Sequence, residues 1–175
     1  MNRRVEVFPL KSPTLPPATT TNCLFLGQQD FAIVDPASPW EGEQSRLLDK
    51  IELRAKQGFS ASSILLTHHH HDHIGGVNAL QKALGLKVLA HRRTAELLSG
   101  RVRVDSFLAE GDVFQTGPDA WDVMHTPGHA TGHLCFVHKT SREAVVGDMV
   151  AGEGTIVLDP PEGELSAYLY SLERL

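Results

Sequence analysis

Short apolar runs separated by turn residues alternate with stretches of helical periodicity in the first half of this chain. Leu47, Leu48 and Ile51 are spaced as on one helix face, and Gly58 ends that pattern. The run 64–66 predicts a short buried strand that leads directly into four histidines. The predicted elements of this half are strands 23–26, 31–34, 64–66 and 87–90, and helices 43–56, 77–84 and 94–98.

Strands dominate the pattern after residue 100. The proline-rich stretch 12–17 predicts a loop, because proline provides no amide donor and restrains its neighbour. The predicted elements of the second half are strands 102–108, 121–125, 133–138 and 143–146, and a final helix over 165–175 with Leu165, Tyr168, Leu169 and Leu172 on one face. This order predicts an α/β protein with a mixed sheet or two sheets.

The length and composition predict one domain over residues 1–175, with 41% hydrophobic residues. No apolar run reaches the roughly 18 residues of a membrane-spanning helix, which argues against a membrane protein. Residues 1–6 lack the apolar region of a secretory signal. Cys23 and Cys135 lie in apolar strands, so we expect buried free thiols and a cytoplasmic protein.

The charge balance argues against tight, nonspecific binding to nucleic acid. The chain has 16 basic and 21 acidic residues, a net charge of −5. One basic cluster, comprising Arg92, Arg93, Arg101 and Arg103, has two interpretations: it contacts phosphates, or it is the solvated face of a helix.

Ten histidines are the unusual feature of the composition, and four of them are consecutive at 68–71. If the strand continues in extended form past Leu66, His68 and His70 project to one side, where two imidazoles can converge on one metal. His69 and His71 project to the other side, and we interpret them as solvated. Asp72 stands at the start of the next predicted helix, where the helix N-terminus favours an ionised carboxylate.

The ordered set of these residues resembles the signature of the metallo-β-lactamase superfamily, and it reads His68-x-His70-x-Asp72-His73. Three further stretches extend the resemblance over nearly the whole chain: 126–133 is similar to the third ligand segment, 145–148 to the strand before the bridging aspartate, and 21–36 to the opening hairpin. The resemblance implies a four-layer αβ/βα sandwich, here missing its C-terminal portion.

The resemblance also implies a site for two metal ions, expected to be Zn²⁺, with manganese or iron left open by the ligand types. His68, His70 and His129 would hold the first ion; Asp72 and His73 would hold the second, with Asp148 bridging. A water shared by two such ions becomes a hydroxide nucleophile near neutral pH, and Asp72 is the expected catalytic residue that orients it.

Other polar residues near these motifs have structural interpretations. We expect Asp35 to be a turn residue or to orient a metal ligand, and His125 and His133 to be hydrogen-bonded within loops.

One family ligand is absent from this sequence. The superfamily supplies another histidine after the bridging aspartate, whereas the 27 residues after Asp148 contain none. Either the sequence is a piece of a longer protein, which we favour, or the second ion has only three ligands. A missing terminal strand would expose a sheet edge, so we expect a homo-oligomer.

The substrate class stays open at this point. Residues 147–155 and 168–172 resemble the β-lactamase-like protein 2 branch, which implies action on single-stranded RNA. This is the closer resemblance; the nearest rival is glyoxalase II, to which residues 126–129 are also similar and which implies hydrolysis of a small-molecule ester or thioester. Two other hypotheses are a non-catalytic metal-binding domain and a mono-iron oxidoreductase that oxidises persulfides.

Overall fold

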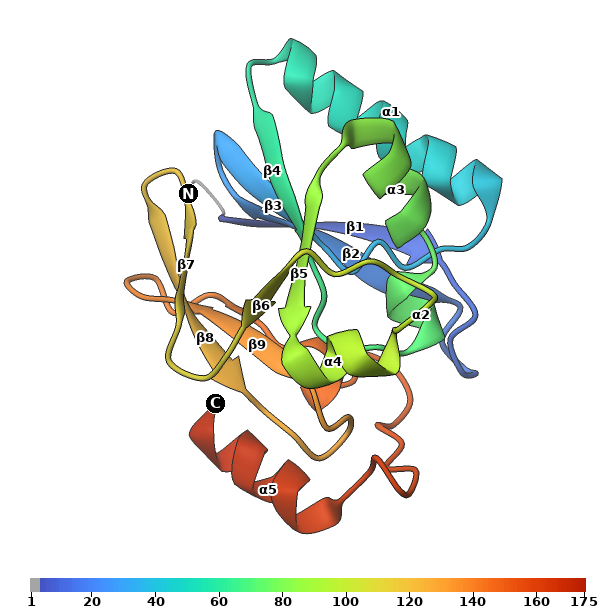
Figure 1. The fold of residues 1–175 in the computed structure, drawn as a ribbon, viewed down its shortest axis with the longest axis vertical. Helices are drawn as coiled ribbons and strands as arrows, with labels where there is room; N and C mark the ends of the chain where they lie inside the picture. The colour runs from blue at the N-terminus through green and yellow to red at the C-terminus, as the bar shows by residue number, and fades with distance from the viewer. Residues whose placement is uncertain (1–3) are drawn as a thin grey trace.

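The computed structural model describes residues 4–175 and contains two β-sheets with helices around them (Figure 1). The six-stranded sheet has the order β1 (Val5–Lys11), β2 (Thr20–Gly27), β3 (Asp30–Val34), β4 (Ser60–Leu65), β5 (Lys87–His91) and β6 (Ser106–Leu108). The four-stranded sheet has the order β10 (Ala144–Val145), β9 (Leu134–His138), β8 (Asp119–His125) and β7 (Val113–Thr116). The helices are α1 (Glu41–Lys56), α2 (His71–Ile74), α3 (Val77–Leu84), α4 (Arg92–Leu97), the 3₁₀ turn η1 (Gly147–Met149) and α5 (Leu165–Arg174).

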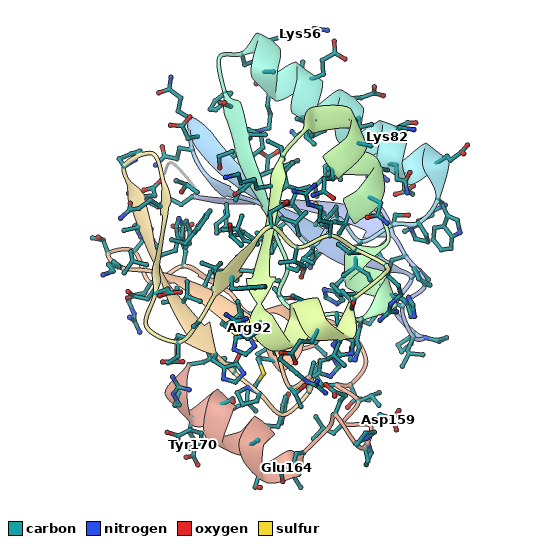
Figure 2. The ribbon with its side chains drawn as sticks, viewed as in Figure 1. Lys56, Lys82, Arg92, Asp159, Glu164 and Tyr170 are labelled. Carbon is teal, nitrogen blue, oxygen red and sulfur yellow. The ribbon has the colours of Figure 1, made fainter. Side chains whose placement is uncertain are left out.

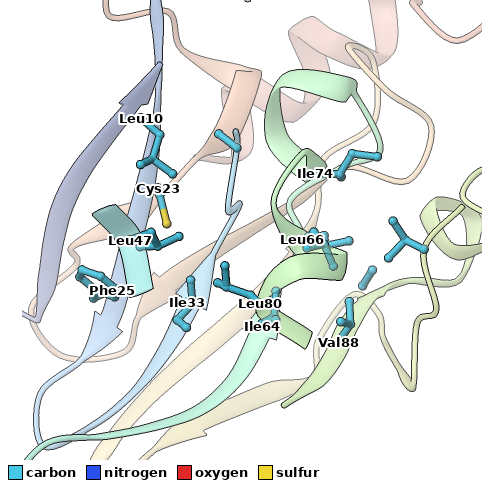
Figure 3. Packing of buried hydrophobic residues seen from close by; sticks show 14 of the residues in the cluster. Leu10, Cys23, Phe25, Ile33, Leu47, Ile64, Leu66, Ile74, Leu80 and Val88 are labelled. Atoms are coloured by element: carbon cyan, nitrogen blue, oxygen red, sulfur yellow. The ribbon is translucent and has the colours of Figure 1, made fainter. Parts of the chain in front are cut away.

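The inner strands β3 and β4 of the six-stranded sheet are largely buried on both faces, which explains their uninterrupted apolar runs. In β3, Phe31 and Ile33 belong to the core under α1 and α3, while Ala32 and Val34 belong to the core between the two sheets. Successive strand residues point to opposite faces, so one short strand contributes to both cores. Figure 3 shows the helix-side core, with Ile33, Ile64 and Leu80 packed together. The predicted α/β sandwich is therefore confirmed.

The strand directions bring one set of loops to a common edge. Strands β3, β4, β5 and β6 pair in parallel, so their C-terminal ends lie along the same edge. Asp35 follows β3, and His68 follows β4 by three residues. Polar groups far apart in the sequence are brought together there, as expected at the carboxyl ends of parallel strands.

Several predicted elements differ from the structure. Strand β1 was not predicted, because Pro9 interrupts its pattern; the strand lies at a sheet edge, where proline is tolerated. The four-residue β7 was also missed, and the predicted strand 102–108 is limited to 106–108. The preceding loop is held instead by Asp105, whose carboxylate accepts from the Val88 amide at 3.0 Å.

Helix α5 forms as predicted, but the face it buries is different. Leu165 and Leu169 are exposed, whereas Ser171 is fully buried. Within residues 4–175, no helix has both the length and the apolar character needed to cross a bilayer. The prediction that the N-terminus is not a secretory signal rests partly on residues 1–3, which lie outside the described residues.

Candidate metal centre

Asp35 fixes the segment that carries the first histidines. Its Oδ1 accepts from the Thr67 amide at 2.8 Å, and its Oδ2 accepts from Thr67 Oγ1 at 2.5 Å. This holds the chain just after β4, so that His68 is fully buried and His70 stands directly before α2. Gly75 and Gly76 let the chain pass close to residues 36–39: a Cβ on Gly75 would lie 2.5 Å from the Pro39 nitrogen.

Four side chains from three segments converge at this edge: His68, His70, His129 and Asp148. One ligand atom from each lies within 4.8 Å of all the others. His70 Nδ1 lies 3.1 Å from His68 Nε2 and 2.9 Å from His129 Nε2. Asp148 Oδ2 lies 3.4 Å from His129 Nε2 and 3.9 Å from His68 Nε2. Four ligands about 2.0–2.1 Å from a tetrahedral zinc ion would be about 3.4 Å apart, so the spacing fits one ion.

Hydrogen bonds on the far side of two rings leave their facing nitrogens free to bind a cation. Thr67 Oγ1 donates to Asp35 and therefore accepts from His68 Nδ1, at 2.9 Å. His129 Nδ1 donates to the carbonyl oxygen of Val157 at 2.8 Å. In a neutral imidazole with a protonated Nδ1, Nε2 carries the lone pair. Both lone pairs thus point into the cluster, which suits a metal ion.

A second group of ligands adjoins the first. His73 Nε2 lies 3.1 Å from Asp148 Oδ1 and 3.9 Å from Asp72 Oδ2, and its Nδ1 donates to Asp35 Oδ2 at 2.9 Å. Asp72 is in the first turn of α2, as predicted. Asp148 lies between the two groups, which is the arrangement that a bridging ligand requires.

Electrostatics also indicate a place for positive charge. Burial, followed by the neighbouring imidazoles, lowers the pKa of His68, and the same causes lower the pKa of His70 to about 4. Burial would also lower the pKa of His73, but Asp35 and Asp148 outweigh it and raise that pKa well above its usual value. The pKa of Asp148 is lowered: burial opposes this, but hydrogen bonding to His73 prevails. The lowered pKa values leave the His68 and His70 rings uncharged and the Asp148 carboxylate ionised near neutral pH, as metal binding requires.

The remaining histidines have other roles. His133 is fully buried; its Nδ1 is 2.8 Å from Thr126 Oγ1, and its Nε2 accepts from the Asp148 amide at 3.2 Å. Burial is the main reason that the pKa of His133 falls to about 3. His125 bonds the Thr131 carbonyl, so both have the predicted structural contacts. His71 is exposed, as expected, whereas His69 is half-buried beside His70. Cys23 and Cys135 are buried free thiols, as predicted.

The basic cluster is largely neutralised by its own neighbours. Arg93 pairs with Glu96 and Glu162, and Arg103 pairs with Asp105. Arg92, which Figure 2 labels beside α4, lies over the Phe107 ring at 4.4 Å. The arginines therefore do not form one open patch, which favours the interpretation as a solvated helix face.

The sequence did not predict the contacts that hold His129 on the side away from the cluster. The Val157 carbonyl and the Glu162 carboxylate both bond the loop 125–131, from the segment between η1 and α5. A backbone carbonyl leaves no signal in a sequence, and an acidic residue after two prolines is typical of many turns.

Comparison with known proteins identifies the family of this chain. The family model of the metallo-beta-lactamase superfamily matches residues 16–175. A hydroxyacylglutathione hydrolase of Cereibacter sphaeroides is 35% identical over 95% of this chain and 62% of its own length. Another, from Pseudomonas fluorescens, is 36% identical over 91% of this chain and 58% of its own length. The chain thus spans about three fifths of the length of these curated relatives.

Solved structures show the same fold. The structure of TTHA1623 in a di-iron-bound form has a TM-score of 0.73 and 28% identity, covering 96% of this chain and 85% of that protein. A metallo-beta-lactamase from Pontibacter korlensis has a TM-score of 0.80 and 18% identity, covering 99% of this chain and 81% of that protein. Motif, fold and family model agree, and the chain belongs to the metallo-beta-lactamase superfamily.

Proposed function

We propose that this chain is the metal-binding part of a thioester hydrolase that acts on hydroxyacyl thioesters of glutathione. The observation that carries the proposal is the convergence of three imidazoles and a carboxylate within 4.8 Å, with His73 and Asp72 beside them. The substrate class is inferred from the curated relatives, which carry the name hydroxyacylglutathione hydrolase. Because the chain spans only part of their length, the rest of the substrate site is outside this proposal.

We infer that His68, His70 and His129 hold one metal ion and that Asp72 and His73 hold a second, with Asp148 shared. Zn²⁺ suits the first set because three imidazoles and a carboxylate are among its usual ligands. Bound there, such an ion would polarise the thioester carbonyl and lower the pKa of a nearby water molecule.

The protein's own groups keep this arrangement fixed and handle the proton. Asp35 holds His73, and His133 holds the backbone of Asp148, so neither ligand is free to rotate away. Asp72 keeps a partly exposed carboxylate at the start of α2, facing His73. We assign it as the base: one of its carboxylate oxygens accepts the proton that water releases as it attacks.

The overall reaction is hydrolysis. The oxygen of water bonds to the carbonyl carbon, the carbon–sulfur bond breaks, and the thiolate leaves with the proton taken up by Asp72. The products are a carboxylic acid and the free thiol. No cofactor is consumed, and no group changes its oxidation state.

Turnover of an acyl-glutathione by the metal-loaded chain tests the proposal. We expect thiol release that depends on added Zn²⁺ and is lost in Asp72→Ala, while the circular dichroism spectrum of that variant is unchanged. Metal analysis of the chain as purified, before Zn²⁺ is added, separates the other hypotheses: two zinc ions per chain fit hydrolysis, and one iron fits persulfide oxidation.

Single-stranded RNA serves as the competing substrate in parallel reactions. Cleavage of RNA with no thiol release would contradict the thioesterase assignment. Metal binding without turnover of either substrate would contradict it too, and would favour a non-catalytic metal-binding domain.

A further inference from the structure

Several residues of the C-terminal segment 150–175 are hydrogen-bonded to the loop 125–131, which carries His129. Arg174 donates to the carbonyl of His125 at 3.0 Å, and Ser171 Oγ donates to the carbonyl of Pro127 at 2.7 Å. One residue further along the loop, the Glu164 amide donates to the carbonyl of Gly128 at 2.8 Å. The loop that carries the third imidazole is therefore built against residues that follow Asp148.

Close packing makes this attachment stiff. Gly128 has a φ of +128°, and a Cβ there would lie 2.2 Å from the Tyr168 nitrogen. The backbones of the loop and of α5 are thus in direct contact, without a side chain between them that could absorb a shift. A displacement of the C-terminal segment would move the loop with it.

Glu162 bonds the C-terminal segment to the far end of the loop, at Thr131. Its carboxylate accepts from Thr131 Oγ1 at 2.5 Å and from the Thr131 amide at 3.2 Å. It also pairs with Arg93 of α4, at 3.2 Å. With only 21% of its side chain exposed, it links three parts of the molecule: the His129 loop, α4 and the C-terminal segment.

The same segment supplies the contact that orients His129. Val157 lies five residues before Glu162, and its carbonyl accepts from His129 Nδ1 at 2.8 Å. Residues 150–164 have no regular secondary structure, so hydrogen bonds must fix their path. Figure 2 shows the end of this segment, where Asp159 and Glu164 lie on the outside of the fold. Glu162, between them in sequence, is half-buried.

We propose that Glu162 is a positioning residue for His129: by tying Thr131 and Arg93 to the C-terminal segment, it keeps the Val157 carbonyl against His129 Nδ1 and so aims Nε2 at the metal. This inference rests on the proposed metal site but not on the identity of the substrate. Glu162 itself touches neither the ion nor the reacting bond. Removal of the Glu162 carboxylate therefore changes the geometry and the affinity with which the protein binds the first ion, although every proposed ligand of that ion is still present.

Cobalt(II) binding to the full chain tests this, because the visible spectrum of cobalt reports ligand geometry independently of turnover. We expect Glu162→Gln to weaken Co²⁺ binding about tenfold and to change the spectrum, since loss of a group that orients a ligand typically costs 10- to 100-fold in affinity. Glu162→Asp should restore part of the affinity. Thr131→Val should cost a similar factor, and the double variant should lose much less than the product of the two.

Glu96→Gln is the matched control. Glu96 is the other carboxylate on Arg93, at 3.3 Å, and it has no contact with the His129 loop among the described residues. We expect its Co²⁺ affinity to stay within twofold of the parent chain. Equal loss in both variants would overturn the inference, because the loss of a carboxylate partner of Arg93 would then explain the effect by itself.

The two proposals fail in different ways. Normal Co²⁺ affinity and spectrum in Glu162→Gln would overturn the positioning role, whatever the chain hydrolyses. If the Co²⁺ affinity and spectrum change as expected but the unmodified chain releases no thiol, only the thioesterase proposal is overturned. Failure of the unmodified chain to bind Co²⁺ would overturn both. Thermal unfolding of the metal-free variants identifies any variant that is misfolded, and Glu162→Asp then replaces it.

Discussion

Two regions supply the candidate metal-binding imidazoles, and they are anchored in different ways. The segment 67–73 follows β4 and is held by one residue, Asp35, at the end of the neighbouring strand. The loop 125–131, which begins at the last residue of β8 in the other sheet, is held by residues up to 49 positions away, in the segment 150–175. The side chain that anchors the first region comes from the six-stranded sheet, whereas the contacts that anchor the second region come from the end of the chain.

The first region is also bonded to β9, the strand that follows the second region. The Leu134 amide at the start of β9 donates to the carbonyl of Thr67 at 2.8 Å. His133, just before it, holds the backbone of Asp148. The comparison teaches that a compact sequence motif supplies only part of the candidate site. The position of His129 depends on residues that are distant in the sequence.

Removing one imidazole from either region has the largest expected effect. His70→Ala and His129→Ala should each lower Zn²⁺ affinity by at least about 100-fold, because a lost ligand costs more than a lost orienting contact. Competition with a chromophoric chelator measures this. If the two regions bind one ion, the losses are similar; a loss in only one variant would show separate sites.

The sequence could indicate where the first region lies, because its candidate ligands are nearly contiguous. His68 and His70 lie between β4 and α2, and Asp72 lies in the first turn of α2, so the local path of the chain suffices to bring the two imidazoles together. His129 and Asp148 were assigned only through resemblance to a family. Glu162 and the Val157 carbonyl were not predicted, since their role depends on a path through space that no local pattern encodes.

Two glycines at the supports offer the next largest contrast. Gly128→Ala combines a left-handed φ with a clash on α5, so we expect a loss of about 3 kcal/mol in unfolding free energy. Gly75→Ala has an ordinary φ but clashes with Pro39, and should cost about 1–2 kcal/mol. Chemical denaturation measures both.

Gly42→Ala is their control. Gly42 lies in α1, and a Cβ there meets nothing within 4 Å, so alanine should be neutral or stabilise by up to about 1 kcal/mol. Equal effects at Gly75 and Gly128 would contradict the view that the second region has the more constrained support.

Asp35→Asn weakens the single anchor of the first region. The amide keeps the size of the side chain but loses the charge opposite His73, so the affinity for a second metal ion should fall about 10- to 100-fold. A calorimetric titration with Zn²⁺ resolves the binding steps of the two ions. An unchanged second binding step would show that His73 is oriented in some other way.

His133→Gln should change how the stability of the metal-free chain depends on pH. The pKa of His133 is lowered from 6.5 to about 3 in the folded protein, mainly by burial. The unfolded chain therefore takes up the extra proton as the pH falls below 6.5, and the folded state loses stability. Relative to the glutamine variant, the parent chain should lose about 2 kcal/mol between pH 7 and pH 5. A constant difference over that range would contradict a neutral, buried His133.

The most direct test is to locate zinc in crystals of the Zn²⁺-loaded chain by anomalous scattering. We expect an ion about 2.0–2.2 Å from His68 Nε2, His70 Nδ1 and His129 Nε2, with the Val157 carbonyl still on His129 Nδ1. An ion bound elsewhere, or ligated by His68 and His70 while His129 points away, would contradict the convergence of the two regions on one site.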